Sequence, residues 1–413
     1  MGERDMAQGV RRAVAFVLLV AAWAAPSLAA PRAGIEHVFI IVLENQSFDV
    51  TFGPASPAPY LAKTLPAKGV LLKQYFGTGH VSLDNYIAMI SGQAATNETR
   101  LDCRIYQDFA QTGVTPDGQA IGGGCVYPAG IKTIADQLAA AGKTWRGYME
   151  DMGNDPAREA STCGHPALNA DDGTQRAEPP SASVPKGDQY ATRHDPFVYF
   201  HSIIDGPDCA ANVVRLERLE HDLKKKSTTP NFVFITPNLC HDGHDTPCKN
   251  GEPGGLVSAD RFLRKWVPRI MSSPAFRHHG LLVVTFDESG LSATKDAAGE
   301  LVISAPGATC CNQQPGPNIG TFPQTVKLGR TTLSFQSFGG DRIGAVLLSP
   351  FLKPGTVSET PFNHYALLKT VEDIFGLDHL GYAGQHGLAG LLSCAASDVV
   401  LRGSVRSALC APD

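Results

Sequence analysis

Short runs of consecutive apolar residues recur along the chain, and each run is followed by polar residues at the start of a loop. Runs of this length without polar alternation are typical of strands that are buried on both faces. Four of them occupy residues 37–43, 231–236, 281–286 and 343–348. They predict a largely parallel sheet that is covered by helices.

Stretches with helical periodicity lie between these runs, at residues 83–90, 131–141, 212–225, 260–271 and 365–375. Alternation of strand, loop and helix is characteristic of α/β proteins. We therefore predict an α/β/α sandwich. Segments 96–193 and 292–336 are rich in Gly and Pro, and we expect them to be loop-rich insertions over the active site.

The first thirty residues have the pattern of an export signal. Arg11 and Arg12 precede an apolar run, and the small residues Ser27 and Ala29 suit a cleavage site. We predict a signal peptide at 1–30 and a single domain at 31–413. The general and the twin-arginine export routes both stay open, and a buried N-terminal helix is the alternative. Export places the protein outside the cell or in a periplasm, with no integral membrane segment after signal removal.

The net charge and the number of cysteines limit the partners and the cellular compartment that are compatible with the sequence. The net charge of −5 argues against nucleic acid or an anionic membrane as the main partner, and it leaves the oligomeric state open. Ten cysteines, all after the predicted signal, fit an oxidising compartment and disulfides. Two pairs are expected as local disulfides, namely Cys103 with Cys125 and Cys394 with Cys410. The adjacent Cys310 and Cys311 are expected to bond to separate partners.

A zinc site is an alternative for one group of residues, which comprises Cys240, His241, His244 and Cys248. Their spacing is compatible with zinc ligation. In an exported protein, however, paired cysteines are more often disulfides. We therefore favour a disulfide here.

Acidic and amide residues follow the predicted strands at the point where each strand ends. Glu44 and Asn45 come after the first run, and Asp287 and Glu288 come after the third. A further group at 238–245 follows the second run. A single acidic or amide residue after a strand is usually part of a turn or a helix cap. Such residues at the carboxyl ends of three strands together indicate a ligand site. Converging carboxylates repel each other unless a cation lies among them, so we predict one divalent metal of unassigned identity.

A second candidate feature is the segment 77–92, in which Ser82 precedes a helix-like run. A hydroxyl at a helix start lies beside unpaired N–H groups and the positive end of the helix dipole, which favour phosphate. Next to a metal, the hydroxyl can attack phosphorus. Asn85, one turn further on, is on the same side and is predicted to donate to a phosphoryl oxygen. The alternative is that Ser82 is an N-cap.

Six ordered motifs give the chain a resemblance to a known family. They are Glu44-Asn-Gln-Ser-Phe-Asp49, the segment 77–92, Arg193-His-Asp-Pro-Phe197, Thr236-Pro-Asn-Leu-Cys-His-Asp-Gly-His-Asp245, Thr285-Phe-Asp-Glu-Ser289 and Asn363-His-Tyr-Ala-Leu-Leu-Lys-Thr-Val-Glu-Asp-Ile-Phe-Gly-Leu377. Over residues 37–377 the chain resembles the bacterial phosphoesterase family of acid phosphatases and non-specific phospholipases C. That family is a branch of the alkaline phosphatase superfamily, so the resemblance implies an alkaline-phosphatase-like fold.

The resemblance also implies roles for individual residues. It implies one metal whose ligands are Glu44, Asn45, Asp287 and Glu288, with the Ser82 oxygen completing the sphere. Asn45 is also expected to bind the substrate, by holding a phosphoryl oxygen together with Asn85 and the helix start. Ser82 is preferred over Thr78 as the nucleophile. His194 and His244 are implied in binding the phosphate and protonating the leaving oxygen. His80 either contacts the phosphate or is structural, and His364 is either a residue of the helix start or a ligand.

The function that follows is a secreted, metal-dependent phosphoric-ester hydrolase. We expect an acid-phosphatase-like phosphomonoesterase that works through a phosphoserine and acts on a small phosphorylated substrate. The alternative is a phospholipase C that recognises a phospholipid head group, although that branch commonly carries extra C-terminal domains. A third possibility is an exported metal-binding or adhesive protein without activity. The predicted ligands and nucleophile are all present, which argues against it.

Overall fold

The computed structural model describes residues 34–393 together with 398 and 399. The predicted signal peptide at 1–30 lies outside the described residues, and so does the expected pair of Cys394 with Cys410. Within the described part of the chain, no helix is long and apolar enough to cross a membrane.

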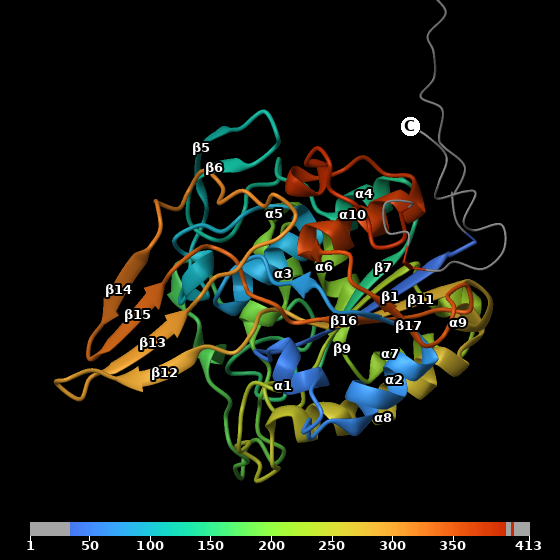
Figure 1. The fold of residues 1–413 in the computed structure, drawn as a ribbon, viewed down its shortest axis with the longest axis horizontal. Helices are drawn as coiled ribbons and strands as arrows, with labels where there is room; N and C mark the ends of the chain where they lie inside the picture. Colours follow the sequence, from blue (N-terminus) through green and yellow to red (C-terminus); the bar gives the residue numbers. More distant parts are fainter. Residues whose placement is uncertain (1–33, 394–397, 400–413) are drawn as a thin grey trace, which may run out of the picture.

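A sheet of eight strands forms the centre of the molecule (Figure 1). In spatial order its strands are β17 (Thr356–Ser358), β2 (Val70–Leu72), β16 (Ala345–Leu348), β11 (Gly280–Phe286), β1 (His37–Leu43), β10 (Phe232–Thr236), β7 (Trp145–Met149) and β9 (Val213–Arg215). The five strands from β11 to β9 are parallel, whereas β16 is antiparallel to β11 and to β2. The largely parallel sheet is therefore confirmed.

Helices cover both faces of this sheet (Figure 1). One layer holds α3 (Ser82–Ser91), α4 (Ile134–Ala140) and α10 (His364–Phe375). The other layer holds α2 (Leu65–Lys68), α7 (Arg218–Asp222), α8 (Gly255–Ser272) and α9 (Pro274–His279). The architecture is the predicted α/β/α sandwich. Because both faces of the sheet are covered, all residues of β1, β10 and β11 are buried, as their continuous apolar sequences require.

The remaining elements are short. The other helices are α1 (Phe48–Phe52), α5 (His201–Ile204) and α6 (Pro207–Asn212). Single turns of 3₁₀- or π-helix are η1 (Tyr60–Thr64), η2 (Thr99–Leu101), η3 (Gly173–Gln175), η4 (Thr192–His194), η5 (Pro196–Tyr199), η6 (Lys226–Thr228) and η7 (Gly381–Gly384). Three two-stranded ribbons pair β3 (Tyr75–Phe76) with β18 (Phe362–Asn363), β4 (Ile105–Tyr106) with β8 (Ala170–Asp171), and β5 (Ala110–Val114) with β6 (Ala120–Gly123).

A second sheet projects from the body of the molecule and is orange in Figure 1. Its strands, in order, are β12 (Ser292–Lys295), β13 (Leu301–Ala305), β15 (Thr331–Phe335) and β14 (Gln324–Leu328). It has a small core of its own, formed by Ala305, Leu333 and Phe335. The segment 292–336, expected to be loop-rich, therefore carries regular β structure. Segment 96–193 holds two of the ribbons, but it also supplies α4 and β7 to the main layers.

The predicted helix at 212–225 is wrong. Residues Val213–Arg215 form β9, and only Arg218–Asp222 are helical, as α7. Val213 and Val214 are β-branched, and pairing with the exposed edge of β7 gives their backbone a ladder of hydrogen bonds. This tertiary pairing outweighs the apolar spacing that suggested a helix.

Four disulfides connect the described residues, namely Cys103–Cys125, Cys163–Cys209, Cys240–Cys248 and Cys310–Cys311. The expected Cys103–Cys125 bond and the disulfide interpretation of Cys240 and Cys248 are confirmed. The expectation of separate partners for Cys310 and Cys311 is wrong, since they bond to each other. A backbone turn at Cys311, where φ is 62°, lets the adjacent side chains meet.

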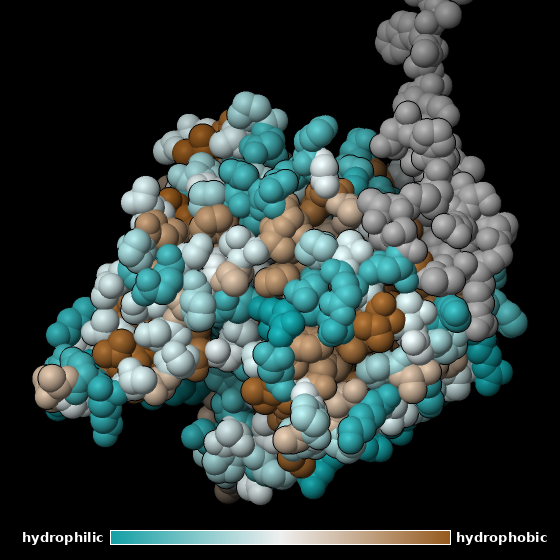
Figure 2. All heavy atoms as spheres, viewed as in Figure 1, coloured by the Kyte–Doolittle hydropathy of each residue, from teal (hydrophilic) through white to brown (hydrophobic). Residues whose placement is uncertain are grey.

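The face of the molecule in Figure 2 is a mosaic of hydrophilic and hydrophobic residues, as is usual on globular proteins. Single exposed apolar side chains include Val50, Val114 and Val357. They belong to α1, β5 and β17, so they are spread over separate elements.

Candidate active site

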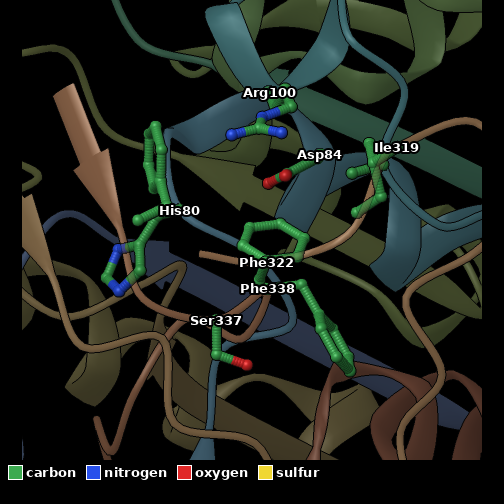
Figure 3. Close-up of a pocket in the computed structure, with 9 residues that line it drawn as sticks. His80, Asp84, Arg100, Ile319, Phe322, Ser337 and Phe338 are labelled. Carbon is green, nitrogen blue, oxygen red and sulfur yellow. The ribbon is translucent and has the colours of Figure 1, made fainter. Parts of the chain in front are cut away.

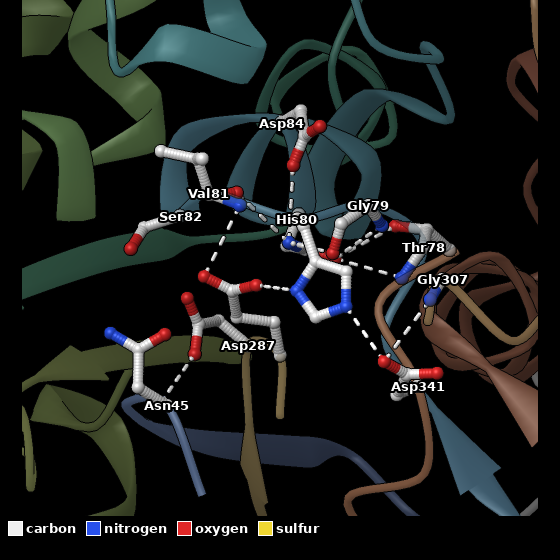
Figure 4. A network of polar contacts seen from close by, with 12 residues as sticks. Asn45, Thr78, Gly79, His80, Val81, Ser82, Asp84, Asp287, Gly307 and Asp341 are labelled. Carbon is white, nitrogen blue, oxygen red and sulfur yellow. Dashed lines mark hydrogen bonds and ion pairs between the residues drawn. The ribbon is translucent and has the colours of Figure 1, made fainter. Parts of the chain in front are cut away.

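The ends of β1 and β11 bring the predicted acidic residues together. The register pairs Leu43 with Phe286, so the residues that follow, Glu44 and Asp287, are level with each other. The backbone N–H of Asn45 donates to Asp287 Oδ1 at 3.0 Å (Figure 4). Asn45 has a φ of 57°, which turns the chain away immediately after the strand. The strand ends therefore meet as the sequence predicted.

Ser82 is the first residue of α3, and its side chain is directed at this cluster. Its Oγ donates to Glu44 Oε2 at 3.0 Å, and the residue is buried. The preceding residue, Val81, has a φ of 76°, which is strained for a β-branched residue, and its N–H donates to Glu288 Oε1 at 3.2 Å. Glu288 thus holds the tight turn that presents the Ser82 hydroxyl.

Asn85 braces the loop before α3. Its Oδ1 accepts hydrogen bonds from the N–H groups of Thr78, at 2.8 Å, and Gly79, at 3.0 Å. Its Nδ2 donates to the carbonyls of Gly79, at 3.0 Å, and Val81, at 3.2 Å. These contacts engage both ends of the amide with the loop, so Asn85 positions the loop, and its donation to a phosphoryl oxygen stays a prediction.

His80 lies between two acids rather than at the mouth of the site. Its Nδ1 contacts Glu288 Oε2, and its Nε2 lies 2.9 Å from Asp341 Oδ2 (Figure 4). Burial lowers the pKa of His80, but these two carboxylates reverse the shift and raise it to about 10. His80 is therefore a buried cation that neutralises Glu288 and Asp341, which favours its structural role.

His194 is buried on the opposite side of Glu44. Its Nε2 lies 3.3 Å from Glu44 Oε1 and its Nδ1 lies 3.4 Å from Asp242 Oδ2. The ring stacks on Tyr86, whose hydroxyl donates to Glu44 Oε1 at 2.7 Å. Burial lowers the pKa of His194, as do the nearby Arg193 and His244. His194 therefore lies between two acids.

His244 is the one of these histidines with substantial access to solvent, its side chain being 34% exposed. Its Nδ1 lies 2.8 Å from Asp245 Oδ1, and its Nε2 lies 3.5 Å from Nη2 of Arg193. Arg193 is buried and its Nε lies 3.4 Å from Asp102 Oδ2. Asp102 Oδ1 in turn accepts from the N–H of Leu83 in the first turn of α3. This chain of contacts links His244 to the start of α3.

His364 is directed at the protein backbone. Its Nε2 donates to the carbonyl of Asp287 at 2.5 Å, so its Nδ1 accepts from the hydroxyl of Tyr75 at 3.1 Å. Burial lowers the pKa of His364 to about 4. It supports the end of β11 as a neutral ring.

Buried acidic side chains dominate the site. Burial raises the pKa of Glu44, with a further contribution from Asp287 and Asp242, and burial and Glu288 raise the pKa of Asp287 to about 8. The Oδ2 atoms of Asp287 and Asp242 have no hydrogen-bond partner among the described residues. Ligand atoms of Glu44, His194 and Asp242 also lie within 4.8 Å of one another. Oxygen donors left without partners in a buried acidic cluster fit a bound cation.

Sequence reasoning missed three residues of this site: Tyr86, Arg193 and Asp242. All three belong to the quoted motifs, which is the signal that could have identified them. Arg193 lies in the short helical turn η4 rather than at a strand end. In the sequence, Tyr86 has the pattern of an ordinary core residue of α3. Their contacts with the acids arise only when distant segments meet.

The second cluster with metal-ligand chemistry comprises Cys240, His241 and Glu252. Cys240 is bonded to Cys248, so no thiolate is available for zinc. His241 lies between Glu150 Oε2, at 2.9 Å, and Glu252 Oε2, at 3.4 Å. Although burial lowers the pKa of His241, Glu150 and Glu252 raise it to about 9, which favours a structural ion pair.

Comparison with known proteins assigns the family. The sequence profile of the Phosphoesterase family matches residues 55–378. The chain belongs to the phosphoesterase family. The matched region includes Ser82, His194, His244 and Asp287, while Glu44 and Asn45 precede it.

Relatives of this phosphoesterase include a probable acid phosphatase of Kluyveromyces lactis, which is 22% identical over 84% of this chain and 60% of its own length. A phosphatidylinositol-3-phosphatase of Mycobacterium tuberculosis is 24% identical over 88% of this chain and 87% of its own length. Non-specific phospholipase C3 of Arabidopsis thaliana is 27% identical over 37% of this chain and 27% of its own length. The phosphoesterase thus spans about three-fifths of the yeast acid phosphatase that it matches.

Proposed function

We propose that this phosphoesterase is an exported phosphomonoesterase in which Ser82 forms a phosphoserine intermediate. The observation that carries the proposal is the hydrogen bond from Ser82 Oγ to Glu44 Oε2 at the start of α3, within a cluster of buried acids. Membership of the phosphoesterase family and the similarity to phosphatases over most of the chain support it. The disulfides support export to an oxidising compartment.

One divalent metal is part of the proposal, and Glu44, Asn45, Asp287 and Glu288 would hold it. The unpartnered Asp287 Oδ2 and the mutual repulsion of the acids support this assignment. When bound, the metal supplies positive charge that stabilises a serine alkoxide and the phosphoryl oxygens. The two carboxylate oxygens of Glu288 also contact His80 Nδ1 and the N–H of Val81.

The chain's own residues account for the two steps. Ser82 Oγ transfers its proton to Glu44 Oε2 and forms a bond to phosphorus, while the bond from phosphorus to the alcohol oxygen breaks. His244, the exposed histidine, donates a proton to the departing oxygen. Backbone N–H groups at the start of α3 bind the phosphoryl oxygens, and His194 orients Glu44. In the second step a water oxygen forms a bond to phosphorus while the bond from phosphorus to Ser82 Oγ breaks, and a water proton restores the hydroxyl of Ser82. Proton exchange with solvent then removes the proton from Glu44 and returns one to His244.

A phospholipase C is the second candidate. It is favoured by the similarity to the Arabidopsis phospholipase C over 165 residues. In that case the substrate would be a phospholipid head group held as a diester. The same nucleophile would serve both reactions, so substrate choice has to be measured directly.

The test compares hydrolysis of para-nitrophenyl phosphate and para-nitrophenylphosphorylcholine by the wild type, Ser82→Ala and Ser91→Ala. Ser91 is a matched control, since it is a buried serine at the other end of α3 whose Oγ donates to the Ile87 carbonyl. We expect monoester cleavage that falls more than about 10³-fold in Ser82→Ala and persists in Ser91→Ala. Chelation should abolish it, and one divalent metal should restore it.

Three outcomes separate the alternatives. Preferred cleavage of the phosphorylcholine diester would assign the phospholipase C activity instead. Full activity of Ser82→Ala would eliminate Ser82 as the nucleophile. Activity that survives exhaustive chelation would eliminate the metal.

A further inference from the structure

Arg100 is buried where the second sheet meets the body of the molecule. It belongs to η2 and is 6% exposed. The carbon of its guanidinium group lies 4.7 Å from the ring centre of Phe335 and 5.5 Å from that of Phe322. Its Nη1 donates to Gln324 Oε1. Phe335 and Gln324 belong to β15 and β14, so Arg100 is held by the second sheet through stacking and a hydrogen bond.

The same guanidinium group faces Asp84 of α3 across a small cavity (Figure 3). Arg100 Nη2 and Asp84 Oδ2 are both buried and have no hydrogen-bond partner among the described residues. The cavity that both residues help to line has a volume of about 10 Å³, which is close to the space that one water molecule requires. Acidic and basic groups that face each other away from bulk solvent interact strongly.

Asp84 also touches the loop 77–81, which precedes Ser82. A Cβ atom added at Gly79 would lie 2.3 Å from Asp84 Oδ2, so the carboxylate packs directly on the loop backbone. Asp84 Oδ1 accepts from Nδ2 of Asn85 at 3.1 Å, and Asn85 holds the loop. Movement of the Asp84 side chain would therefore disturb the loop that leads into Ser82.

A second contact joins the sheet to the same loop. The side chain of Val81 packs against the core of the second sheet, formed by Ala305, Leu333 and Phe335. Val81 is also the residue with the strained φ of 76°. A strained conformation persists only where its surroundings fix it. The sheet supplies part of that support, and Glu288 supplies the rest.

We propose that the second sheet is a brace for the nucleophile, and that Arg100 is a positioning residue which acts on Ser82 through Asp84. Arg100 stabilises the loop 77–81 in the conformation that directs the Ser82 hydroxyl at the acidic cluster. The proposal rests on the proposed role of Ser82. It extends that role by assigning a catalytic purpose to the second sheet, which contributes none of the proposed ligands or proton donors.

The test measures kcat and KM for para-nitrophenyl phosphate in Arg100→Gln, Arg100→Lys, Asp84→Asn and the double variant Arg100→Gln/Asp84→Asn. We expect Arg100→Gln to lower kcat by about 10- to 100-fold, as expected for a misplaced nucleophile, with KM changed by less than about twofold. Arg100→Lys, which keeps a cation, should recover part of kcat. Because both residues are proposed to act through one charge interaction across the cavity, the double variant should be no slower than the slower single variant.

Arg264→Gln is the matched control. The guanidinium of Arg264 also lies over an aromatic ring, 5.0 Å from the centre of Tyr60, and pairs with Asp260, but it belongs to α8 in the opposite layer. We expect its kcat to equal that of the wild type. A loss in this control as large as in Arg100→Gln would show a general effect of removing a stacked arginine and would overturn the proposal.

Hydrogen exchange gives a readout that does not depend on activity. In Arg100→Gln, amides of residues 77–91 should exchange faster than in the wild type, while amides of β10 should be unchanged. Wild-type kcat in Arg100→Gln, additive losses in the double variant, or unchanged exchange at 77–91 would each overturn the brace. An inactive wild type or an active Ser82→Ala would instead refute the proposed function, so the two failures are distinguishable.

Discussion

Glu372 gives a prediction about how stability depends on pH. This residue of α10 is completely buried; its Oε1 accepts from the N–H of Leu380 at 2.9 Å, and its Oε2 has no partner among the described residues. Burial raises its pKa from about 4.5 to about 8. The native state therefore keeps a proton that the unfolded chain releases between these pH values. The resulting stability is fully present below about pH 4.5 and is lost as the pH rises through 8.

The size of the effect follows from the same interval. A pKa difference contributes about 1.4 kcal/mol for each pH unit, so Glu372 is expected to remove roughly 4 kcal/mol between pH 4.5 and 8. In Glu372→Gln the amide oxygen still accepts from Leu380, but the side chain no longer titrates. The free energy of unfolding of this variant should fall less steeply with pH than that of the wild type.

Urea unfolding at pH 5, 6, 7 and 8 with intact disulfides measures these slopes. Glu217→Gln is the control, since Glu217 is exposed and should leave the wild-type slope unchanged. The informative quantity is the difference in slope between Glu372→Gln and the wild type, because other buried acids contribute equally to both. Identical slopes would refute the reasoning and would mean that Glu372 is ionised in the native state.

Three further predictions concern the core, the site and a disulfide. Ile40→Ala, in a fully buried position of β1, should lower the free energy of unfolding by about 2–5 kcal/mol in urea titrations. Tyr86→Phe removes the 2.7 Å hydrogen bond to Glu44, so kcat/KM for para-nitrophenyl phosphate should fall by about tenfold, as for a charge-assisted bond of about 1.5 kcal/mol; an unchanged value would show that Glu44 does not need this donor. Replacing Cys103 and Cys125 by serine opens a loop with a sequence separation of 22 and should cost about 3 kcal/mol, measured by the shift of the urea midpoint.

The sheet and the ends of its strands could be predicted from the sequence. The run at 37–43 has no polar interruption after His37, which allowed its exact bounds to be found, and the acids at 44 and 287 follow from the carboxyl-end rule. The start of a helix at Ser82 could be predicted from the helix-like run that follows it, whereas its role as nucleophile stays a prediction that rests on the resemblance. These features depend on local sequence alone.

Other features depend on segments that meet only in the folded chain. The Asp341 carboxylate reaches His80 across 261 positions, and nothing near either residue indicates the pair. Residues 292–335 are exposed on much of their surface, so their strands lack the apolar pattern from which β1 was predicted. Asn85 has the right place for a phosphate donor in sequence, but its Nδ2 already donates to the carbonyls of Gly79 and Val81.

The pairing of β1 with β11 has a consequence for how the sheet acquires its alignment. Apolar alternation usually fixes the register of a strand, because a slip by one residue exposes its hydrophobic side chains. Both faces of these two strands are buried and apolar, so such a slip would leave nearly the same amount of hydrophobic surface covered. A polar contact distinguishes the correct register, because the Asn45 N–H donates to Asp287 Oδ1, a side-chain acceptor that a shifted strand would move away. The residues proposed for chemistry thus also help to fix the strand register of the central sheet. Replacing them is therefore expected to impair correct folding as well as catalytic turnover.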